Sequence, residues 1–387
     1  MDYSAVLSRC AQELRPSGIR KFFDLAATME GVISLGVGEP DFKTPYAIRR
    51  AGIESLEKGR TWYTANAGLL ELRRQIAAYL ARRFSLSYTD QEILVTVGGS
   101  EAIDLCIRAC LNPGEEVLIP EPSFVCYDPI TRLAGGVPVP IVTRPEDGFR
   151  LTPQALEAAI TPRTKVLVLP YPNNPTGAIM KEEHLESIAG ILRERDILVL
   201  SDEIYAELTF EGRHVSIASL PGMAERTVVV GGFSKAYAMT GWRLGYAAGP
   251  QEVIKVMTKL HQFAIMCAPT TSQYAAIEAM KHCDEEIERM AVQFGMRRGL
   301  MVSSLNRMGL TCADPLGAFY VFPSIRSTGL SSDEFCQRLL EEQKVAVIPG
   351  NAFGQSGEGH VRISYSYSVE HLIEALRRIE LFVEGLK

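Results

Sequence analysis

The chain has 387 residues, 47% hydrophobic and 22% charged, which suits a globular protein of two or three domains and excludes a disordered or fibrous one. The 40 Lys and Arg against 46 Asp and Glu give a net charge of −6 without basic runs, which argues against a nucleic-acid-binding protein. The 8 Cys form no Cys-x-x-Cys pair, the 6 His form no ligand cluster, and no apolar run is long enough to span a membrane. The N-terminus has no signal-peptide pattern, so we expect a cytoplasmic protein without metal or membrane attachment.

Short β-branched runs alternate with helical patterns through the middle of the chain. We expect strands at 91–97, 116–120, 137–142, 165–169, 197–200, 227–230 and 243–247, with helices such as 100–111 between them. Because these runs are apolar on both faces, they predict a mostly parallel seven-stranded sheet covered by helices on both faces.

The pattern changes after residue 283. A long charged helix is expected at 284–307, followed by strands at 319–322, 345–348 and 360–364 that alternate with two helices. We therefore predict an α/β fold with a large domain at 45–283. A smaller α+β domain is expected from both chain ends, 1–44, with a helix near 19–29, and 284–387.

Lys235 follows the strand expected at 227–230, and its neighbours are Phe, Ser, Ala, Tyr, Ala and Met. Most lysines are solvated, but one in apolar surroundings loses proton affinity and becomes an amine nucleophile. The carboxyl ends of parallel strands are where open α/β sheets bind ligands. The sequence therefore predicts that Lys235 forms a Schiff base with a carbonyl compound.

Polar residues also follow neighbouring strands. Asp202 could cap a helix, or it could hold a cation, because a carboxylate about 4 Å from a positive charge gains roughly 4 kcal/mol at a dielectric constant of about 20. Asn174 lies in the stiff loop Tyr171-Pro-Asn-Asn-Pro-Thr-Gly177 and could donate to a phenolate. Gly98-Gly99-Ser100 opens a helix whose N–H groups can bind an anion.

In this order, the segments resemble the fold-type-I, pyridoxal-phosphate-dependent aminotransferases of the aspartate aminotransferase class. The resemblance covers nearly the whole chain, from Ser34-Leu-Gly-Val-Gly-Glu-Pro-Asp-Phe42 through Tyr63-Thr-Ala-Asn-Ala-Gly68 to Val361-Arg-Ile-Ser-Tyr365. Its most specific part is Lys235 with Arg243 eight residues later, combined with Asp-x-x-Tyr and Asn-Pro-Thr-Gly.

The resemblance implies a role for each matching residue. Lys235 would carry pyridoxal 5'-phosphate and move the substrate proton, and Asp202 would pair with the ring nitrogen. Tyr205 and Asn174 would bind the ring oxygen O3'.

The remaining cofactor contacts are implied in the same way. Arg243 would bind the phosphate beside the N–H groups of Gly99 and Ser100. Phe124 would stack on the ring. Tyr63 would reach the phosphate in a neighbouring subunit, which implies a homodimer with composite sites.

For the substrate, the resemblance implies that Gly38 and Arg362 hold the α-carboxylate, the arginine through two parallel bonds, with Asn174 beside them. One departure concerns the phosphate site. Some relatives have a serine three residues before the lysine, where this chain has Gly232; Ser234 is a possible substitute.

Three other functions share part of this pattern. Ser100 lies in a pattern one residue short of a nucleophile elbow, and Asp202 and His360 follow in hydrolase order, but a serine hydrolase leaves Lys235 and Arg243 without a role. A ligand-sensing module of a transcription regulator would need a helix-turn-helix, which we do not expect before residue 30. A carbon–sulfur β-lyase or decarboxylase of the same fold shares the cofactor residues, because the cofactor carries the chemistry.

The substrates are less specified than the reaction. The runs Ser17-Gly-Ile-Arg-Lys-Phe22 and Ser201-Asp-Glu-Ile-Tyr-Ala-Glu-Leu208 look most similar to bacterial N-acetyl-diaminopimelate-type and broad-specificity members. Resemblance implies an L-amino acid and a 2-oxo acid as partners, with glutamate and 2-oxoglutarate as one pair.

Overall fold

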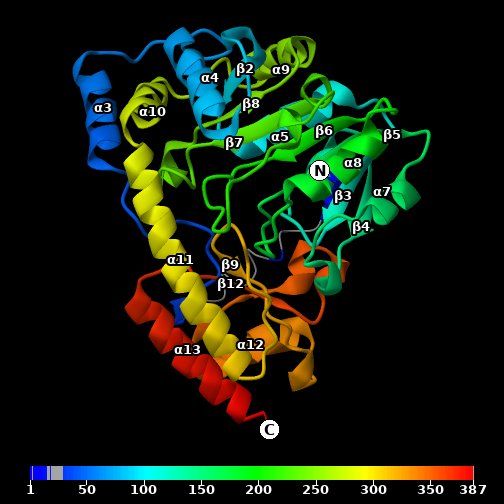
Figure 1. The fold of residues 1–387 in the computed structure, drawn as a ribbon, viewed down its shortest axis with the longest axis vertical. Helices are drawn as coiled ribbons and strands as arrows, with labels where there is room; N and C mark the ends of the chain where they lie inside the picture. The colour runs from blue at the N-terminus through cyan, green and yellow to red at the C-terminus, as the bar shows by residue number, and fades with distance from the viewer. Residues whose placement is uncertain (2, 15–17, 19–28, 387) are drawn as a thin grey trace.

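The structure, a computed structural model, describes residues 1, 3–14, 18 and 29–386. Its centre is the predicted seven-stranded, mostly parallel sheet, and the strands lie in the order β2-β8-β7-β6-β5-β3-β4 (Figure 1). Only β8 in this sheet is antiparallel to its neighbours. The strands are β2 (Ile93–Thr96), β3 (Glu116–Glu121), β4 (Val137–Val142), β5 (Thr164–Leu169), β6 (Leu198–Asp202), β7 (Thr227–Gly232) and β8 (Gly245–Ala248).

Helices cover both faces of this sheet, which explains why its inner strands are apolar on both sides. α5, α6 and α9 pack on one face, and α4, α7, α8 and α10 pack on the other. α3 packs against α10. These helices are α3 (Tyr46–Glu57), α4 (Leu70–Phe84), α5 (Gly99–Cys110), α6 (Tyr127–Leu133), α7 (Pro153–Ala159), α8 (Glu182–Leu192), α9 (Gln251–Ala264) and α10 (Thr270–His282).

All seven strands begin and end within two residues of the expected positions, but β4 differs in its burial and β8 in its first residue. β4 is an edge strand that pairs only with β3, and its Val137 and Val142 are exposed rather than buried. Pro138 and Pro140 fit this position, because a proline has no N–H to give to a second neighbour. β8 begins at Gly245, not at Arg243, because Arg243 has a left-handed φ of 52° that a strand does not accept.

The C-terminal part forms the lower half of Figure 1. α11 (Asp284–Arg307) runs down from the large sheet, and α12 (Ser332–Gln343) and α13 (Val369–Glu384) lie beside its lower end. The strand expected at 345–348 is two strands, because the chain changes partners at Val347. β10 (Val345–Ala346) pairs with β1 (Ile33–Ser34), whereas β11 (Ile348–Pro349) belongs to the antiparallel sheet β11-β12-β9, with β12 (Val361–Ser364) and β9 (Tyr320–Val321).

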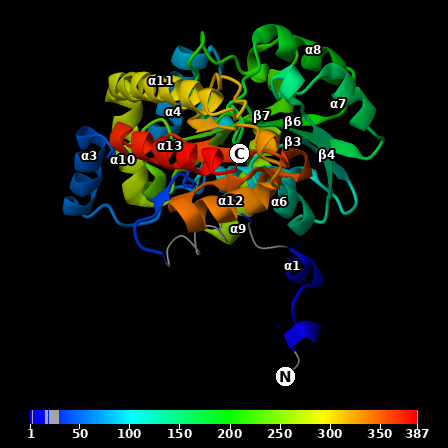
Figure 2. The ribbon, with the colours of Figure 1, turned by 90° about the horizontal axis from the view of Figure 1, so that it is seen from below.

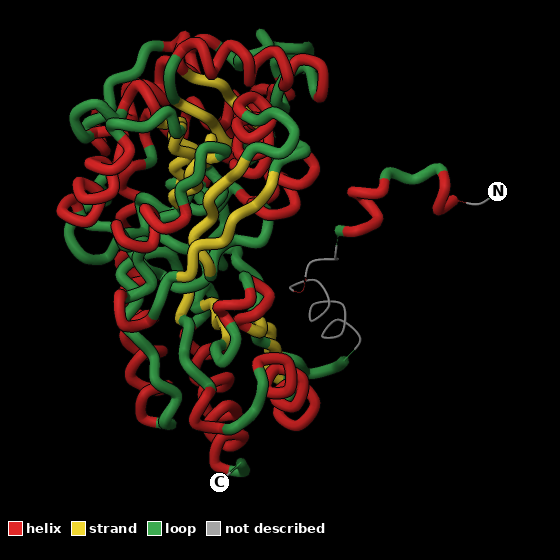
Figure 3. The backbone as a smooth tube through the Cα atoms, turned by 90° about the vertical axis from the view of Figure 1, so that its right-hand side faces the viewer, coloured by secondary structure: helices red, strands yellow, loops and turns green. Residues whose placement is uncertain are grey.

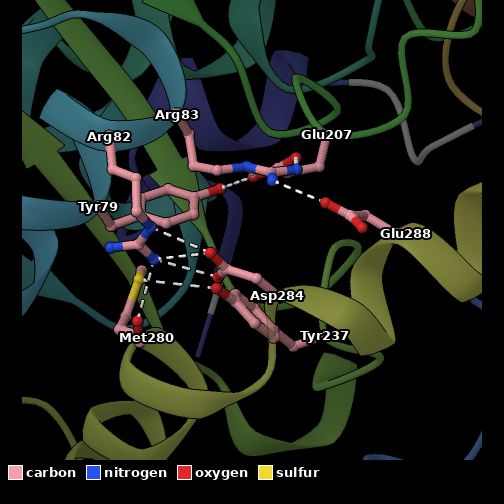
Figure 4. A network of polar contacts seen from close by, with 8 residues as sticks. All are labelled: Tyr79, Arg82, Arg83, Glu207, Tyr237, Met280, Asp284 and Glu288. Carbon is pink, nitrogen blue, oxygen red and sulfur yellow. Dashed lines mark hydrogen bonds and ion pairs between the residues drawn. The ribbon is translucent and has the colours of Figure 1, made fainter.

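A polar network fixes the upper end of α11 to α4 and to the loop after β6 (Figure 4). The Arg83 guanidinium donates to Glu207 at 2.6 and 3.0 Å and to Glu288 at 3.1 Å. The Tyr79 hydroxyl also donates to Glu207. Glu207 lies five residues after Asp202, so the network supports the loop that leaves the sheet at a predicted site residue.

The β1–β10 pairing brings residues 33–34 to the C-terminal part of the chain, which supports our proposal of a small domain from 1–44 and 284–387 beside a large domain of 45–283. The short helix α1 (Arg9–Glu13) projects from the body and touches it at α6, where the Cys10 thiol donates to the Arg132 carbonyl (Figures 2 and 3). The helix expected near 19–29 lies outside the described residues except for Met29. Within the described part of the chain, no helix is long and apolar enough to cross a membrane.

Candidate active site

A cavity of about 270 Å³ lies at the carboxyl edge of the large sheet, next to the β9-β12 sheet. Residues that follow β2, β3, β5, β6 and β7 all reach this edge because these strands are parallel. The antiparallel β8 brings its preceding residue, Arg243, to the same place. The predicted site residues that line the cavity are Gly38, Gly99, Ser100, Phe124, Asn174, Asp202, Tyr205, Lys235, Arg243 and Arg362.

The Lys235 side chain enters the cavity from the loop after β7. Its ammonium nitrogen donates to the carbonyl oxygen of Gly38 and lies 5.9 Å from the centre of the Tyr205 ring. Burial lowers the pKa of Lys235 to about 8, since a charged amine loses its hydration there. A substantial fraction of this amine is therefore neutral near pH 8 and able to act as a nucleophile.

Asp202 ends β6 on the sheet face covered by α5. It is 6% exposed, accepts a bond from the Tyr127 hydroxyl at 2.6 Å, and accepts another from the Ile204 N–H at 3.2 Å. Burial raises the pKa of Asp202, while the two hydrogen bonds oppose that rise by stabilising the carboxylate. The carboxylate is held in one orientation and can pair with a cation in the cavity.

The start of α5 and Arg243 form a positively polarised end of the cavity. The first N–H groups of a helix have no acceptor in the helix, and those of Gly99 and Ser100 are at this position. Gly98 has φ of 79°, and a Cβ atom there would lie 2.7 Å from the Arg243 guanidinium. Glycine is therefore required for the close approach, and the arrangement suits an anion. Ser234 also lines the cavity, whereas Gly232 does not.

Arg362 and Asn174 also meet in the lining of the cavity. Arg362 is 3% exposed and donates to the Asn174 side-chain oxygen at 2.9 Å and to the Gly36 carbonyl oxygen. Its Nε is buried without a partner among the described residues. An unpaired buried N–H is costly, so this guanidinium edge is suited to an anionic ligand.

Two candidate residues lie elsewhere. Tyr63 is 77% exposed and does not line the cavity. His360 stacks on the Phe322 ring at 5.0 Å and is also outside the cavity lining, so it does not join Ser100 and Asp202 in a hydrolase triad. The substrate-related stretch at 17–22 lies outside the described residues except for Gly18. No cluster suited to a metal ion occurs among residues 1, 3–14, 18 and 29–386.

The sequence did not indicate three residues that support the site. Tyr127 donates to Asp202, and Tyr320 contacts both Tyr205 and Arg362. Glu101, in the first turn of α5, accepts from the Val97 N–H and contacts His261 at 2.8 Å. Glu101 is the third residue of α5, but the residue before the helix is Gly98 and not Ser or Thr, so the capping-box pattern that would have marked it is absent. The tyrosines carried no local signal either.

Comparison with known proteins gives one consistent result. Residues 30–379 match the family model "Aminotransferase class I and II". The putative aminotransferase YugH of Bacillus subtilis is 56% identical over 98% of this chain and 99% of its own. Aromatic-amino-acid aminotransferase 2 of Thermococcus litoralis is 46% identical over 98% and 99%. The crystal structure of Thermus thermophilus aspartate aminotransferase with maleate superposes with a TM-score of 0.93 at 40% identity, covering 97% of this chain and 99% of the other.

Proposed function

The chain belongs to the class I and II aminotransferases, which use pyridoxal 5'-phosphate, and on this premise we propose how its site works. It transfers an amino group between an L-amino acid and a 2-oxo acid, with glutamate and 2-oxoglutarate as one pair, through a Schiff base on Lys235. The observation that carries the proposal is the convergence of Lys235, Asp202, Arg243 and Arg362 on one cavity.

The residues present fit the cofactor. The Gly98 turn leaves the space that the Arg243 guanidinium needs beside the α5 N-terminus, and this end would hold the phosphate dianion. Asp202 would hold the protonated ring nitrogen, with Phe124 against the ring. When bound, the cofactor supplies an aldehyde and a ring that stabilises negative charge at the substrate Cα.

Lys235 has two tasks in this proposal. Its partly neutral amine would hold the cofactor aldehyde covalently, and as a free amine it would move the proton at the substrate Cα. Both tasks need the neutral amine, and a pKa of about 8 makes that form more abundant near neutral pH than it is in a solvated lysine. The Tyr127 hydroxyl keeps Asp202 oriented toward the cavity throughout.

Arg362 binds the substrate α-carboxylate, together with the backbone at Gly38. The guanidinium is planar and offers parallel N–H bonds that match a carboxylate. Asn174 is held by Arg362 through its side-chain oxygen, so its amide N–H groups remain free to donate to O3'. The Tyr205 hydroxyl is the second donor to that oxygen.

We further propose a homodimer in the cytoplasm. Tyr63 is exposed and absent from the cavity of its own chain, which supports a contact with the phosphate site of a partner subunit. All 8 cysteines lie among the described residues and are free, as in reducing compartments.

A half-reaction screen tests the reaction and the substrate. Holoenzyme is mixed with single L-amino acids without a 2-oxo acid, and the cofactor absorbance and the 2-oxo product are followed. The natural donor is expected to give one equivalent of its 2-oxo acid per cofactor. If no amino acid gives this half-reaction, and a cysteine conjugate instead releases pyruvate and ammonia, the enzyme is a β-lyase.

Peptide mapping after borohydride reduction tests the lysine. The label is expected on Lys235, and a label on Lys43 or any other lysine would refute the assignment.

For the dimer, an inactive Lys235→Ala chain is mixed with a weakened Tyr63→Ala chain, and heterodimers should recover activity at one site of the two. Heterodimers that form without recovery would contradict shared sites.

A further inference from the structure

Tyr320, on β9, lies outside our functional assignments but touches three of the proposed site residues, Tyr205, Arg362 and Gly38. It is 1% exposed, and its hydroxyl lies 2.8 Å from that of Tyr205. The Arg362 guanidinium carbon lies 4.5 Å from the centre of its ring. The hydroxyl also fills the space over Gly38, where a Cβ atom would lie 2.1 Å from the phenol oxygen.

These contacts join groups that are assigned to different ligands. Tyr205 is proposed to bind the cofactor oxygen O3', whereas Arg362 and Gly38 are proposed to bind the substrate carboxylate. They also come from different parts of the chain, because Tyr205 follows β6 of the large sheet and Tyr320 and Arg362 lie on adjacent strands of the small one. One phenol thus lies between the cofactor side and the substrate side of the cavity.

We propose that Tyr320 is a positioning residue: its hydroxyl donates to Tyr205 and thereby directs the Tyr205 proton toward the cofactor oxygen, while its ring holds the Arg362 guanidinium for the carboxylate. Tyr320 also lines the cavity, but in this scheme it acts through Tyr205 and Arg362. This inference rests on the proposed function.

The direction of the bond between the two hydroxyls follows from their surroundings. Either oxygen can donate in the 2.8 Å contact. If Tyr205 donated to Tyr320, its only proton would be used and it could not donate to the cofactor. Arg362 lies over the ring of Tyr320. A cation near a phenol makes the hydroxyl more acidic, so Tyr320 is the better hydrogen-bond donor of the two.

The acidity of the two phenols is set first by burial. Burial raises the pKa of Tyr320, but the positive charge of Arg362 opposes the rise. Burial raises the pKa of Tyr205 well above its usual range. The other titratable groups facing the pair are Tyr365 and Tyr367 near Tyr320, and Lys235 and Asp202 near Tyr205.

The contact with Gly38 adds a steric reason for the glycine. Any side chain at position 38 would displace the phenol from Tyr205, because the Cβ position is already occupied by the phenol oxygen. The same residue gives its carbonyl oxygen to Lys235. Gly38 therefore matters through the place it leaves for Tyr320 as well as through its own backbone.

The test compares four holoenzymes with the wild type: Tyr320→Phe, Tyr320→Leu, Tyr205→Phe and Tyr365→Phe. The last is a matched control, because Tyr365 is fully buried beside the site and its hydroxyl donates only to the Ala318 carbonyl at 3.1 Å among the described contacts. Two quantities are measured. One is the midpoint of the pH titration of the bound cofactor's absorbance, and the other is the inhibition constant of two unreactive carboxylates, succinate and 3-phenylpropionate.

Tyr205→Phe should raise the absorbance midpoint by about 1–2 pH units, because one hydrogen bond to a charged oxygen is lost. Tyr320→Phe should raise it by only a few tenths of a unit, since it removes a bond that strengthens the Tyr205 bond, and should leave both inhibition constants unchanged. Tyr320→Leu should raise the midpoint equally and weaken both inhibitors by about 3- to 30-fold, because the ring under Arg362 is lost. Tyr365→Phe should change neither quantity.

A double variant separates this inference from the proposed function. In the Tyr205→Phe background, Tyr320→Phe should no longer move the midpoint. No shift in Tyr205→Phe would refute the proposed role of Tyr205 itself. A normal Tyr205→Phe shift with no effect of Tyr320→Phe, or with an effect that persists in the double variant, would overturn only the role of Tyr320.

Discussion

Replacement of Arg362 by lysine tests how the chain recognises its substrates. The positive charge stays in place, but an ammonium group cannot make the two parallel bonds that a guanidinium makes to a carboxylate. In the structure, the guanidinium lies 4.5 Å from the Tyr320 ring centre and 4.7 Å from that of Phe353, so two buried aromatic rings restrict its position. The lysine would lose one charge-assisted bond in a site that excludes water.

The loss can be given a size. A hydrogen bond to a charged group contributes about 1.5–3 kcal/mol, which corresponds to a factor of about 10 to 150 in rate constant. Since every amino acid and every 2-oxo acid substrate carries the same carboxylate, kcat/KM should fall by this factor for both substrates of the pair. The dissociation constant of the cofactor should not change, because Asp202 and the phosphate end of the cavity are untouched.

Steady-state kinetics with both substrates provides the assay. Arg338→Lys on α12 is a suitable control, because Arg338 is 43% exposed and pairs only with Glu342 at 2.8 Å among the described residues. That variant should be silent. An unchanged kcat/KM for both substrates of Arg362→Lys, or a loss for one substrate alone, would refute the carboxylate role.

Three further predictions concern stability and the cofactor. The Lys235 amine has a folded-state pKa of about 8 against 10.5 for a free lysine, so the unfolded apoprotein binds more protons between these pH values. In urea titrations, the free energy of unfolding of the wild type relative to Lys235→Met should therefore rise by about 2–3 kcal/mol from pH 8 to pH 10.5. A difference that does not change with pH would contradict the burial argument. Asp202→Asn should lower kcat about 10³-fold, because roughly 4 kcal/mol of charge pairing is lost, and should alter the spectrum of the bound cofactor; normal turnover would exclude the pairing. Arg83→Met should lower the free energy of unfolding by about 3 kcal/mol, since it leaves the buried Glu207 carboxylate without its cation, whereas Arg82→Met, whose partner Asp284 is 31% exposed, should cost less than about 1 kcal/mol (Figure 4). Equal losses for the two arginine variants would show that burial of the pair does not matter.

The sequence alone determined the elements of the large sheet and the chemistry of its edge. Runs such as Lys165 to Leu169 are apolar on both faces because both faces of the sheet are covered, and burial of this kind leaves a local pattern. Lys235, Asp202 and Asn174 each follow such a run, so the direction of the strands was enough to predict that they converge. The small strands were harder to define, because residues 345–348 form one apolar segment in the sequence. The change of pairing partner at Val347 depends on other strands, and one of them, β1, lies more than 300 residues away.

Only the tertiary structure decided which side chains support the predicted site residues. Tyr127 reaches Asp202 across 75 positions of sequence, Tyr320 reaches Tyr205 across 115, and Arg362 reaches Asn174 across 188. A buried tyrosine has the same local pattern whether its hydroxyl meets a carboxylate or a backbone carbonyl. The partner is selected by how whole elements pack, because side-chain hydrogen bonds extend only about 3 Å and depend on the relative position of two strands or helices that the local pattern does not specify.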